Sequence, residues 1–195
     1  VRSMTARRQL PTDEARDLLA LTREIATKEL APRSAEAEAA ETFPRDVFRM
    51  LGRAGLLSLP YSEEHGGGGQ PYEVYLQVLE EIGRGWAGVG VGVSVHTLAC
   101  FPVAQWGSEA QKERFLPDML GGELLGAYCL SEAHSGSDAA ALSTKAVRDG
   151  DDWAGWSGPG APAPGAASAD AATVHSSSRS PAAASAVDSL ASMAS

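Results

Sequence analysis

The residues best suited to chemistry lie in one stretch, residues 124–138, with the sequence LLGAYCLSEAHSGSD. The apolar run over residues 125–130 is typical of a strand covered on both faces. At Ser131 the chain enters a loop of small polar residues, where Gly136 allows the backbone to turn and to approach a ligand. Such a loop can hold a phosphate or the polar edge of a heterocycle. Taken alone, the stretch is more typical of an ordinary strand exit.

The polar side chains of this loop do not predict a hydrolase. Residues so close in one loop cannot generally align a nucleophile, a base and an orienting group, and the sequence has no Gly-x-Ser-x-Gly elbow. The residues considered for such a triad are Ser131, His134, Ser135, Ser137 and Asp138. We interpret His134 as a surface loop residue.

A metal site is not predicted either. The histidines are scattered along the sequence, at His65, His96, His134 and His175, and neither cysteine has ligand spacing. His96 lies in an apolar stretch and is interpreted as a hydrogen-bonded core histidine.

Charge and composition narrow the class of protein. A net charge of −9 argues against a nucleic-acid partner, which would require clustered Lys and Arg. The hydrophobic content of 44% is sufficient for a packed core. Cys100 and Cys129 have apolar neighbours and are interpreted as buried thiols. Together with the lack of a signal-peptide pattern at the start, they predict a cytoplasmic protein.

Residues 85–108 carry no Asp, Glu, Lys or Arg and are long enough to cross a bilayer. Several Gly residues and the polar His96, Thr97 and Gln105 make this stretch a poor hydrocarbon segment. We therefore predict a buried core element and no membrane span.

Several further motifs follow one another in a fixed order. They are YSEEHGG over residues 61–67, SVHT over 94–97, GSEAQKERFLP over 107–117, YCLSE over 128–132 and GSD over 136–138. In this order the motifs resemble the acyl-CoA dehydrogenases, and the last two resemble the flavin-binding signature of that family. Several weak signals in one order are stronger than any one of them.

The resemblance extends from about Asp13 to Asp152. Inside the signature, Ala133 and His134 replace the Pro and the small residue usual in the family. These replacements alter the stiffness of the loop more than its hydrogen-bonding groups. The resemblance implies a mainly α fold, in which an N-terminal helical bundle is followed by the truncated start of a β domain.

The activity implied by the resemblance is FAD-dependent α,β-dehydrogenation of a fatty acyl-CoA thioester. A carboxylate base removes the α-proton while the β-hydrogen leaves as hydride to the flavin. By matching positions, the implied cofactor-binding residues are Tyr128, Cys129, Leu130, Ser131, Gly136 and Ser137. Tyr128, Leu130 and Ser131 are expected at the flavin ring. Gly136 and Ser137 are expected near the pyrophosphate and the acyl-CoA, so that Ser137 is also the implied substrate-binding residue.

The family's catalytic base belongs to a C-terminal domain that we expect to be missing here, so no catalytic residue is assigned in this chain. Glu132 is interpreted as a structural hydrogen-bond or ion-pair partner. The implied partners are acyl-CoA, further copies of the chain in a dimer or tetramer, and either an electron-transfer flavoprotein or oxygen as electron acceptor.

Local signals predict four helical regions before the signature. One begins after the cap Thr12 and is ended or kinked by Pro32, with a solvated continuation over residues 33–41. The others begin at Pro44, at Pro71 and, through a Ser108/Gln111 capping box, at Ser108. The second is expected to end at Gly55 and the last near Pro117. The third should bury Tyr72, Tyr75, Val78, Leu79 and Ile82.

Residues 89–95 alternate Val with Gly or Ser, which locally favours a strand. The resemblance implies a helix there, and we adopt the helix because local propensity is a weak predictor. After the signature, a strand is expected over residues 141–147, followed by a hairpin at Asp149-Gly150.

These patterns divide the chain into an arm (1–11), a helical domain (12–123), a partial β domain (124–153) and a tail (154–195). The tail is rich in Ala, Ser, Gly and Pro and lacks apolar periodicity, so we predict that it is disordered. A frameshift near Asp152 is the favoured origin of the tail, and a natural linker is the alternative.

Two functions remain open. The chain is an incomplete flavoenzyme, or it is a non-catalytic helical binding or assembly module or an inactive fragment. We expect little flavin to be retained, because much of the cofactor site is missing.

Overall fold

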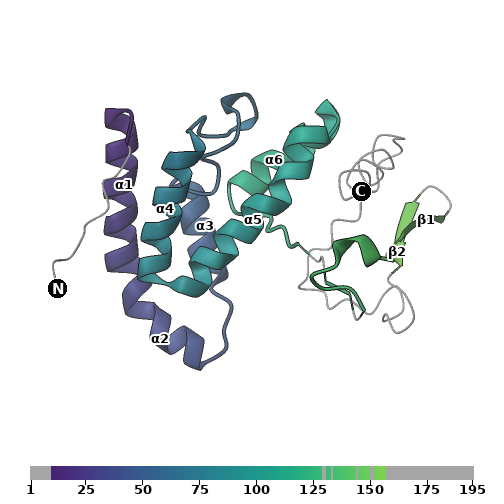
Figure 1. Cartoon of the computed structure of the whole chain (residues 1–195). Helices are drawn as coiled ribbons and strands as arrows, with labels where there is room; N and C mark the ends of the chain where they lie inside the picture. Colours follow the sequence, from purple (N-terminus) through teal and green to yellow (C-terminus); the bar gives the residue numbers. More distant parts are fainter. Residues whose placement is uncertain (1–9, 129–130, 133, 144, 150–151, 157–195) are drawn as a thin grey trace.

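The structure is a computed structural model, and it describes residues 10–128, 131–132, 134–143, 145–149 and 152–156. The described part is mainly α-helical, as predicted, and Figure 1 shows a helical bundle followed by a short hairpin. Most of the predicted tail, residues 157–195, lies outside the described residues.

The first helical region begins at the predicted cap. The hydroxyl of Thr12 accepts a hydrogen bond from Ala15 N at 3.0 Å, and α1 spans Asp13–Ile25. A π-helical turn, η1 (Ala26–Leu30), leads into α2 (Ala31–Ala39), which buries no residue. Pro32 lacks an N–H and its ring crowds the carbonyl four residues earlier, so a wider turn before it accommodates the ring. Figure 1 shows α2 leaving the direction of α1 at this turn.

The next helices follow the predicted boundaries closely. Helix α3 spans Arg45–Arg53 after Pro44, and the chain turns at Gly55 with φ 74°. A 3₁₀ turn, η2 (Glu63–His65), precedes α4 (Tyr72–Gly85). The positive φ of Gly55 is the left-handed conformation expected after a helix C-terminus.

Residues 89–95 are helical, so the helix implied by the resemblance is confirmed. They belong to α5 (Ala87–Trp106), which is followed by α6 (Glu109–Leu120) and its Ser108/Gln111 capping box. Helix α6 continues three residues beyond Pro117, because its last turn buries Leu116, Met119 and Leu120. Packing therefore decides where this helix ends.

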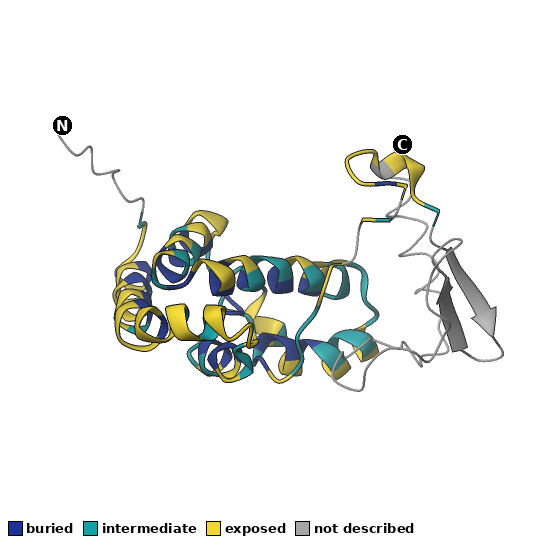
Figure 2. Ribbon diagram, turned by 90° about the horizontal axis from the view of Figure 1, so that it is seen from below, coloured by how far each residue is buried: buried dark blue, intermediate teal, exposed yellow. Residues whose placement is uncertain are grey.

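The core lies between the helices, and Figure 2 shows their buried sides facing inward. Leu51, Leu57, Val78 and Ile82 are among its fully buried side chains. The prediction for the third helix was wrong at Tyr72, which is 60% exposed, while Val74 is buried instead. Tyr72 is the first residue of α4 and lies at the edge of the bundle, where it contacts the ring of Tyr75.

One glycine permits a close contact between elements. A Cβ atom added to Gly52 in α3 would lie 2.1 Å from the carbonyl oxygen of Gly121. Because that neighbour is backbone, it cannot move aside as a side chain would. The turn after α6 therefore packs directly on α3.

After α6 the predicted strand over residues 125–130 is not observed in its described part, residues 125–128. The backbone N–H of Gly126 donates to a side chain of α5 instead of to a neighbouring strand. Residues 129 and 130 lie outside the described residues. A β-strand requires a neighbouring strand for its hydrogen bonds, and residues 125–128 lie against the helical layer instead.

The hairpin predicted at Asp149-Gly150 is confirmed. Strands β1 (Lys145–Asp149) and β2 (Asp152–Trp156) pair antiparallel, with Asp149 opposite Asp152. A 3₁₀ turn, η3 (Ala139–Ala141), occupies the start of the segment predicted as strand. Strand β2 extends to Trp156, three residues into the region assigned to the tail.

Among the described residues, α5 is the one helix that is long and apolar enough to cross a membrane. It packs against α4 and α6. Val89, Val93, His96 and Cys100 are buried on its inner side. These contacts cover its inner side, and 33% of its most apolar stretch is buried.

Candidate functional site

The segment that carries the signature is held to the helical bundle by His96. The ring Nε2 of His96 lies 2.9 Å from the carbonyl oxygen of Met119 near the end of α6. Its Nδ1 accepts the backbone N–H of Gly126 at 3.0 Å. One buried ring thus joins α5, α6 and the chain leading to Tyr128.

These two contacts determine the protonation of the ring. Because the Gly126 N–H donates to Nδ1, that atom carries no proton, and Nε2 must donate to the Met119 carbonyl. The neutral Nε2–H tautomer satisfies both partners. Burial lowers the pKa of His96, against the opposing effect of the Met119 carbonyl, and so favours the neutral ring further. The predicted hydrogen-bonded core histidine is confirmed.

The surroundings of His96 are closely packed. The Tyr61 hydroxyl donates to the carbonyl oxygen of Thr97, which connects the loop after α3 to α5. Burial raises the pKa of the Cys100 thiol to about 12, so the thiol stays protonated and unreactive near neutral pH. A Cβ on Gly126 would lie 2.5 Å from that of Ala99. The segment therefore enters the signature along a closely fitted path.

Glu132 holds the signature loop in shape. Its carboxylate oxygen Oε2 accepts the N–H and the hydroxyl of Ser143, both at 2.9 Å, and lies 3.3 Å from His134 Nε2. Glu132 and Ser135 also exchange two backbone hydrogen bonds. The predicted structural role of Glu132 is confirmed, and His134 is an exposed loop residue as predicted.

Several predicted ligand-binding residues lie on the outside of this loop. Ser131, Gly136 and Ser137 are exposed, and Tyr128 is 51% exposed. A Cβ on Gly136 would meet no atom within 4 Å. Cys129 and Leu130 lie outside the described residues. The described loop therefore offers an open face with exposed polar groups.

A separate hollow lies at the start of α5. It is lined in part by Phe43, Phe48, Trp86 and Val89, and the Trp86 indole donates to Glu38 at 2.6 Å nearby. This hollow shares no lining residue with the signature. It consequently contributes nothing to the loop described above.

The helical bundle matches known proteins in sequence. The family described as acyl-CoA dehydrogenase, N-terminal domain, matches residues 12–123. An acyl-CoA dehydrogenase of Bacillus subtilis is 39% identical over 129 residues, which cover 66% of this chain and 34% of that protein. The human short-chain specific acyl-CoA dehydrogenase of mitochondria is 39% identical over 137 residues, covering 70% and 33%.

Solved structures show the same likeness. Butyryl-CoA dehydrogenase from Megasphaera elsdenii superposes with a TM-score of 0.67 at 31% identity, covering 77% of this chain and 40% of that one. A chain from a study of the electron transferring flavoprotein of Acidaminococcus fermentans has a TM-score of 0.69 at 31% identity, covering 73% and 38%.

The bundle therefore corresponds to the N-terminal helical domain found in a class of dehydrogenases. More specifically, the chain belongs to the acyl-CoA dehydrogenase family. It spans about a third of the length of the curated relatives it matches.

Proposed function

We propose that this chain supplies the helical domain and one flavin-facing loop of an FAD-dependent acyl-CoA dehydrogenase. The reaction is α,β-dehydrogenation of an acyl-CoA thioester. The observation that carries the proposal is the attachment of the signature segment to the family-matched bundle through His96 and Gly126. A binding loop is effective only when a rigid scaffold orients it.

The residues proposed to hold FAD are Tyr128, Cys129, Leu130, Ser131, Gly136 and Ser137. Tyr128, Leu130 and Ser131 face the flavin ring mainly through backbone groups, with the Ser131 hydroxyl as an added hydrogen-bonding group. Gly136 and Ser137 face the pyrophosphate and the acyl-CoA substrate, for which the open space beside Gly136 leaves room. When bound, the flavin accepts the β-hydrogen of the thioester as hydride.

No glutamate of this chain is proposed as the α-proton base. Glu132 sits in the signature, but its carboxylate is engaged by Ser143 and His134 and maintains the loop. The base belongs to a further part of the enzyme, as in the family. Acyl-CoA, further copies of the chain and an electron-transfer flavoprotein are the proposed partners, and the cytoplasm is the proposed location.

A second candidate is a binding or assembly module without turnover. It is favoured by the open loop, because Ser131, Gly136 and Ser137 are exposed and the described residues cover one side of a ligand at most. The fully buried side chains of the main bundle core all lie before the signature.

Titration of the purified chain with FAD, followed by flavin fluorescence, separates the two candidates. We expect weak saturable binding and little flavin retained through purification. Ser131→Ala and Ser137→Ala should each weaken binding several-fold, by about 0.5–1.5 kcal/mol for one lost hydrogen bond. Ser34→Ala on α2 is the matched control and should bind as the original chain does.

Reduction of a dye by acyl-CoA in the presence of FAD provides the second measurement. We expect none from this chain alone, since no base is assigned within it. Absence of saturable FAD binding, or equal binding by all three serine variants and the original chain, would favour the non-catalytic module.

A further inference from the structure

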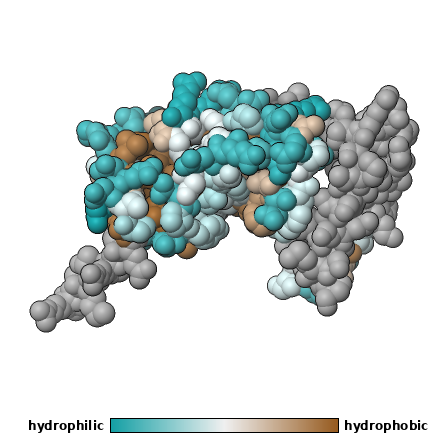
Figure 3. Space-filling model, turned by 90° about the horizontal axis from the view of Figure 1, so that it is seen from above, coloured by the Kyte–Doolittle hydropathy of each residue, from teal (hydrophilic) through white to brown (hydrophobic). Residues whose placement is uncertain are grey.

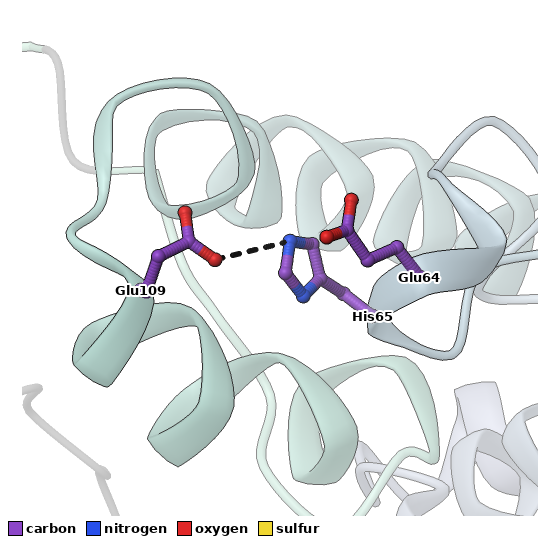
Figure 4. A group of neighbouring side chains, drawn as sticks. All are labelled: Glu64, His65 and Glu109. Carbon is purple, nitrogen blue, oxygen red and sulfur yellow. Dashed lines mark ion pairs between the residues drawn. The ribbon is translucent and has the colours of Figure 1, made fainter.

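Three side chains of types that can ligate a metal ion lie together at the surface, and they come from two elements that are distant in sequence. Glu64 and His65 lie on η2, and Glu109 is the first residue of α6. One ligand atom of each lies within 4.8 Å of the other two, and His65 Nε2 is 3.9 Å from Glu109 Oε2. Figure 4 shows the imidazole between the two carboxylates.

Local hydrogen bonds set the position of both elements. The Ser62 hydroxyl accepts Glu64 N at 3.3 Å, and His65 N donates to the Ser62 carbonyl at 3.2 Å. On the other side, the Ser108 capping box fixes the first turn of α6. The cluster thus joins two elements that are each ordered without it.

The three groups differ in exposure in a way that suits a ligand set. The side chain of His65 is only 16% exposed, whereas that of Glu109 is 68% exposed and Glu64 is exposed. The imidazole is therefore largely held by its surroundings, while the carboxylates can adjust to an ion.

Lys112 pairs with only one of the two oxygens of the Glu109 carboxylate. Lys112 Nζ lies 2.9 Å from Oε1, and the other oxygen, Oε2, faces His65. The two carboxylates and Lys112 together leave one negative charge to attract a cation.

We propose that Glu64, His65 and Glu109 form a binding site for a divalent transition-metal ion of the zinc type. One imidazole nitrogen with carboxylate oxygens is a donor set that suits Zn²⁺ and Co²⁺ better than Mg²⁺ or Ca²⁺. Bonds of about 2.1 Å in a tetrahedron place ligand atoms about 3.4 Å apart. Adjustment of the glutamate side chains provides that contraction, and water completes the coordination.

The consequence of binding would be a link between the loop of η2 and the start of α6. An ion bound by the folded state alone raises its stability. The site shares no residue with the signature, so the inference does not depend on the proposed function.

Titration of the full chain, without an affinity tag, with Co²⁺ tests the proposal through the visible absorbance of the ion. Competition by Zn²⁺ and the shift of the thermal midpoint on addition of Zn²⁺ are measured alongside. His65→Asn and Glu109→Gln should each reduce affinity at least tenfold and abolish the thermal shift. Lys112→Gln should increase affinity, because it removes the competitor of Glu109.

His134→Asn is the matched control. His134 is an exposed histidine whose Nε2 lies 3.3 Å from the Glu132 carboxylate, away from the proposed ligands, so its removal should leave the titration unchanged. Far-UV circular dichroism checks that each variant keeps its helices. The proposal is overturned if His65→Asn titrates like the original chain, if His134→Asn removes binding, or if no Co²⁺ spectrum develops.

Discussion

His96 shows how one side chain can serve both the core and the site. Its two ring nitrogens bind backbone groups of different segments, Met119 O and Gly126 N, while the ring itself is 1% exposed. Removing the ring leaves the part-buried Gly126 N–H without this acceptor, whereas the buried Met119 carbonyl keeps the Gly122 N–H at 3.1 Å. The cost of leaving a polar group unpaired is larger than the net value of the hydrogen bond itself.

We predict that His96→Ala lowers the free energy of unfolding by about 2–4 kcal/mol, from two lost hydrogen bonds and a cavity. Urea unfolding followed by circular dichroism measures the change. His134→Ala, at an exposed position, should stay within about 0.5 kcal/mol of the original chain. Equal effects of the two substitutions would contradict the role assigned to His96.

The lowered pKa of His96 predicts a pH dependence of stability. The unfolded chain binds a proton near the ordinary histidine pKa of about 6.5, whereas the folded chain binds it only at lower pH. Stability is therefore complete above about pH 7 and declines as the pH falls below 6.5, by up to about 1.4 kcal/mol per pH unit.

The measurement is urea unfolding between pH 7.5 and about 5. His96→Gln should show a shallower decline than the original chain over this range, because it lacks the titrating ring. The comparison of the two slopes removes the contribution of the acidic groups common to both chains. Identical slopes would mean that His96 titrates alike in the folded and unfolded states.

Among the elements, the contact of α3 with the turn after α6 tolerates the least change. A Cβ on Gly52 would lie 2.1 Å from the Gly121 carbonyl oxygen, whereas a Cβ on Gly83 in α4 would meet nothing within 4 Å. Gly52 and Gly83 both lie within helices, so replacing each by Ala compares the space available for a methyl group at the two positions.

We predict opposite effects for this pair. Gly52→Ala should destabilise the fold by about 1–3 kcal/mol, because backbone must shift to accept the methyl group. Gly83→Ala should stabilise it by about 0.5–1 kcal/mol through helix propensity. Thermal unfolding of both variants measures the difference, and destabilisation by Gly83→Ala would contradict the open space beside it.

At the scale of the whole molecule, apolar side chains on one side of α5 are exposed in the part of the chain that the structure describes. Val91 is 64% exposed, Leu98 45% and Phe101 46%. Figure 3 shows one face of the molecule on which hydrophilic residues predominate. The chain spans about a third of its relatives, and exposed apolar residues grouped in this way favour association.

We predict that the purified chain associates with increasing concentration through this side of α5. The double variant Val91→Lys/Leu98→Lys should shift sedimentation toward the monomer. Leu21→Lys is the control, because Leu21 is 41% exposed but lies on α1, which is separated from α5 by α4. An equal shift by Leu21→Lys would show a general effect of charge.

Local sequence signals determined most helix boundaries of this chain. The Thr12 cap, the Ser108/Gln111 box and the Gly55 turn act through hydrogen bonds and φ angles within a few residues, so a reader of the sequence can place them. The family resemblance supplied the helix over residues 89–95, where local propensity alone favoured a strand.

Only the tertiary structure decided the exposure of Tyr72, the continuation of α6 beyond Pro117, and the path of residues 125–128. Each depends on what another segment offers: a bundle edge, a buried last turn, or the Nδ1 atom of His96. The contact between His65 and Glu109 is likewise not apparent from the sequence, where 43 residues lie between them. Sequence spacing reports neighbours within one element, whereas packing between elements determines which distant groups share a site.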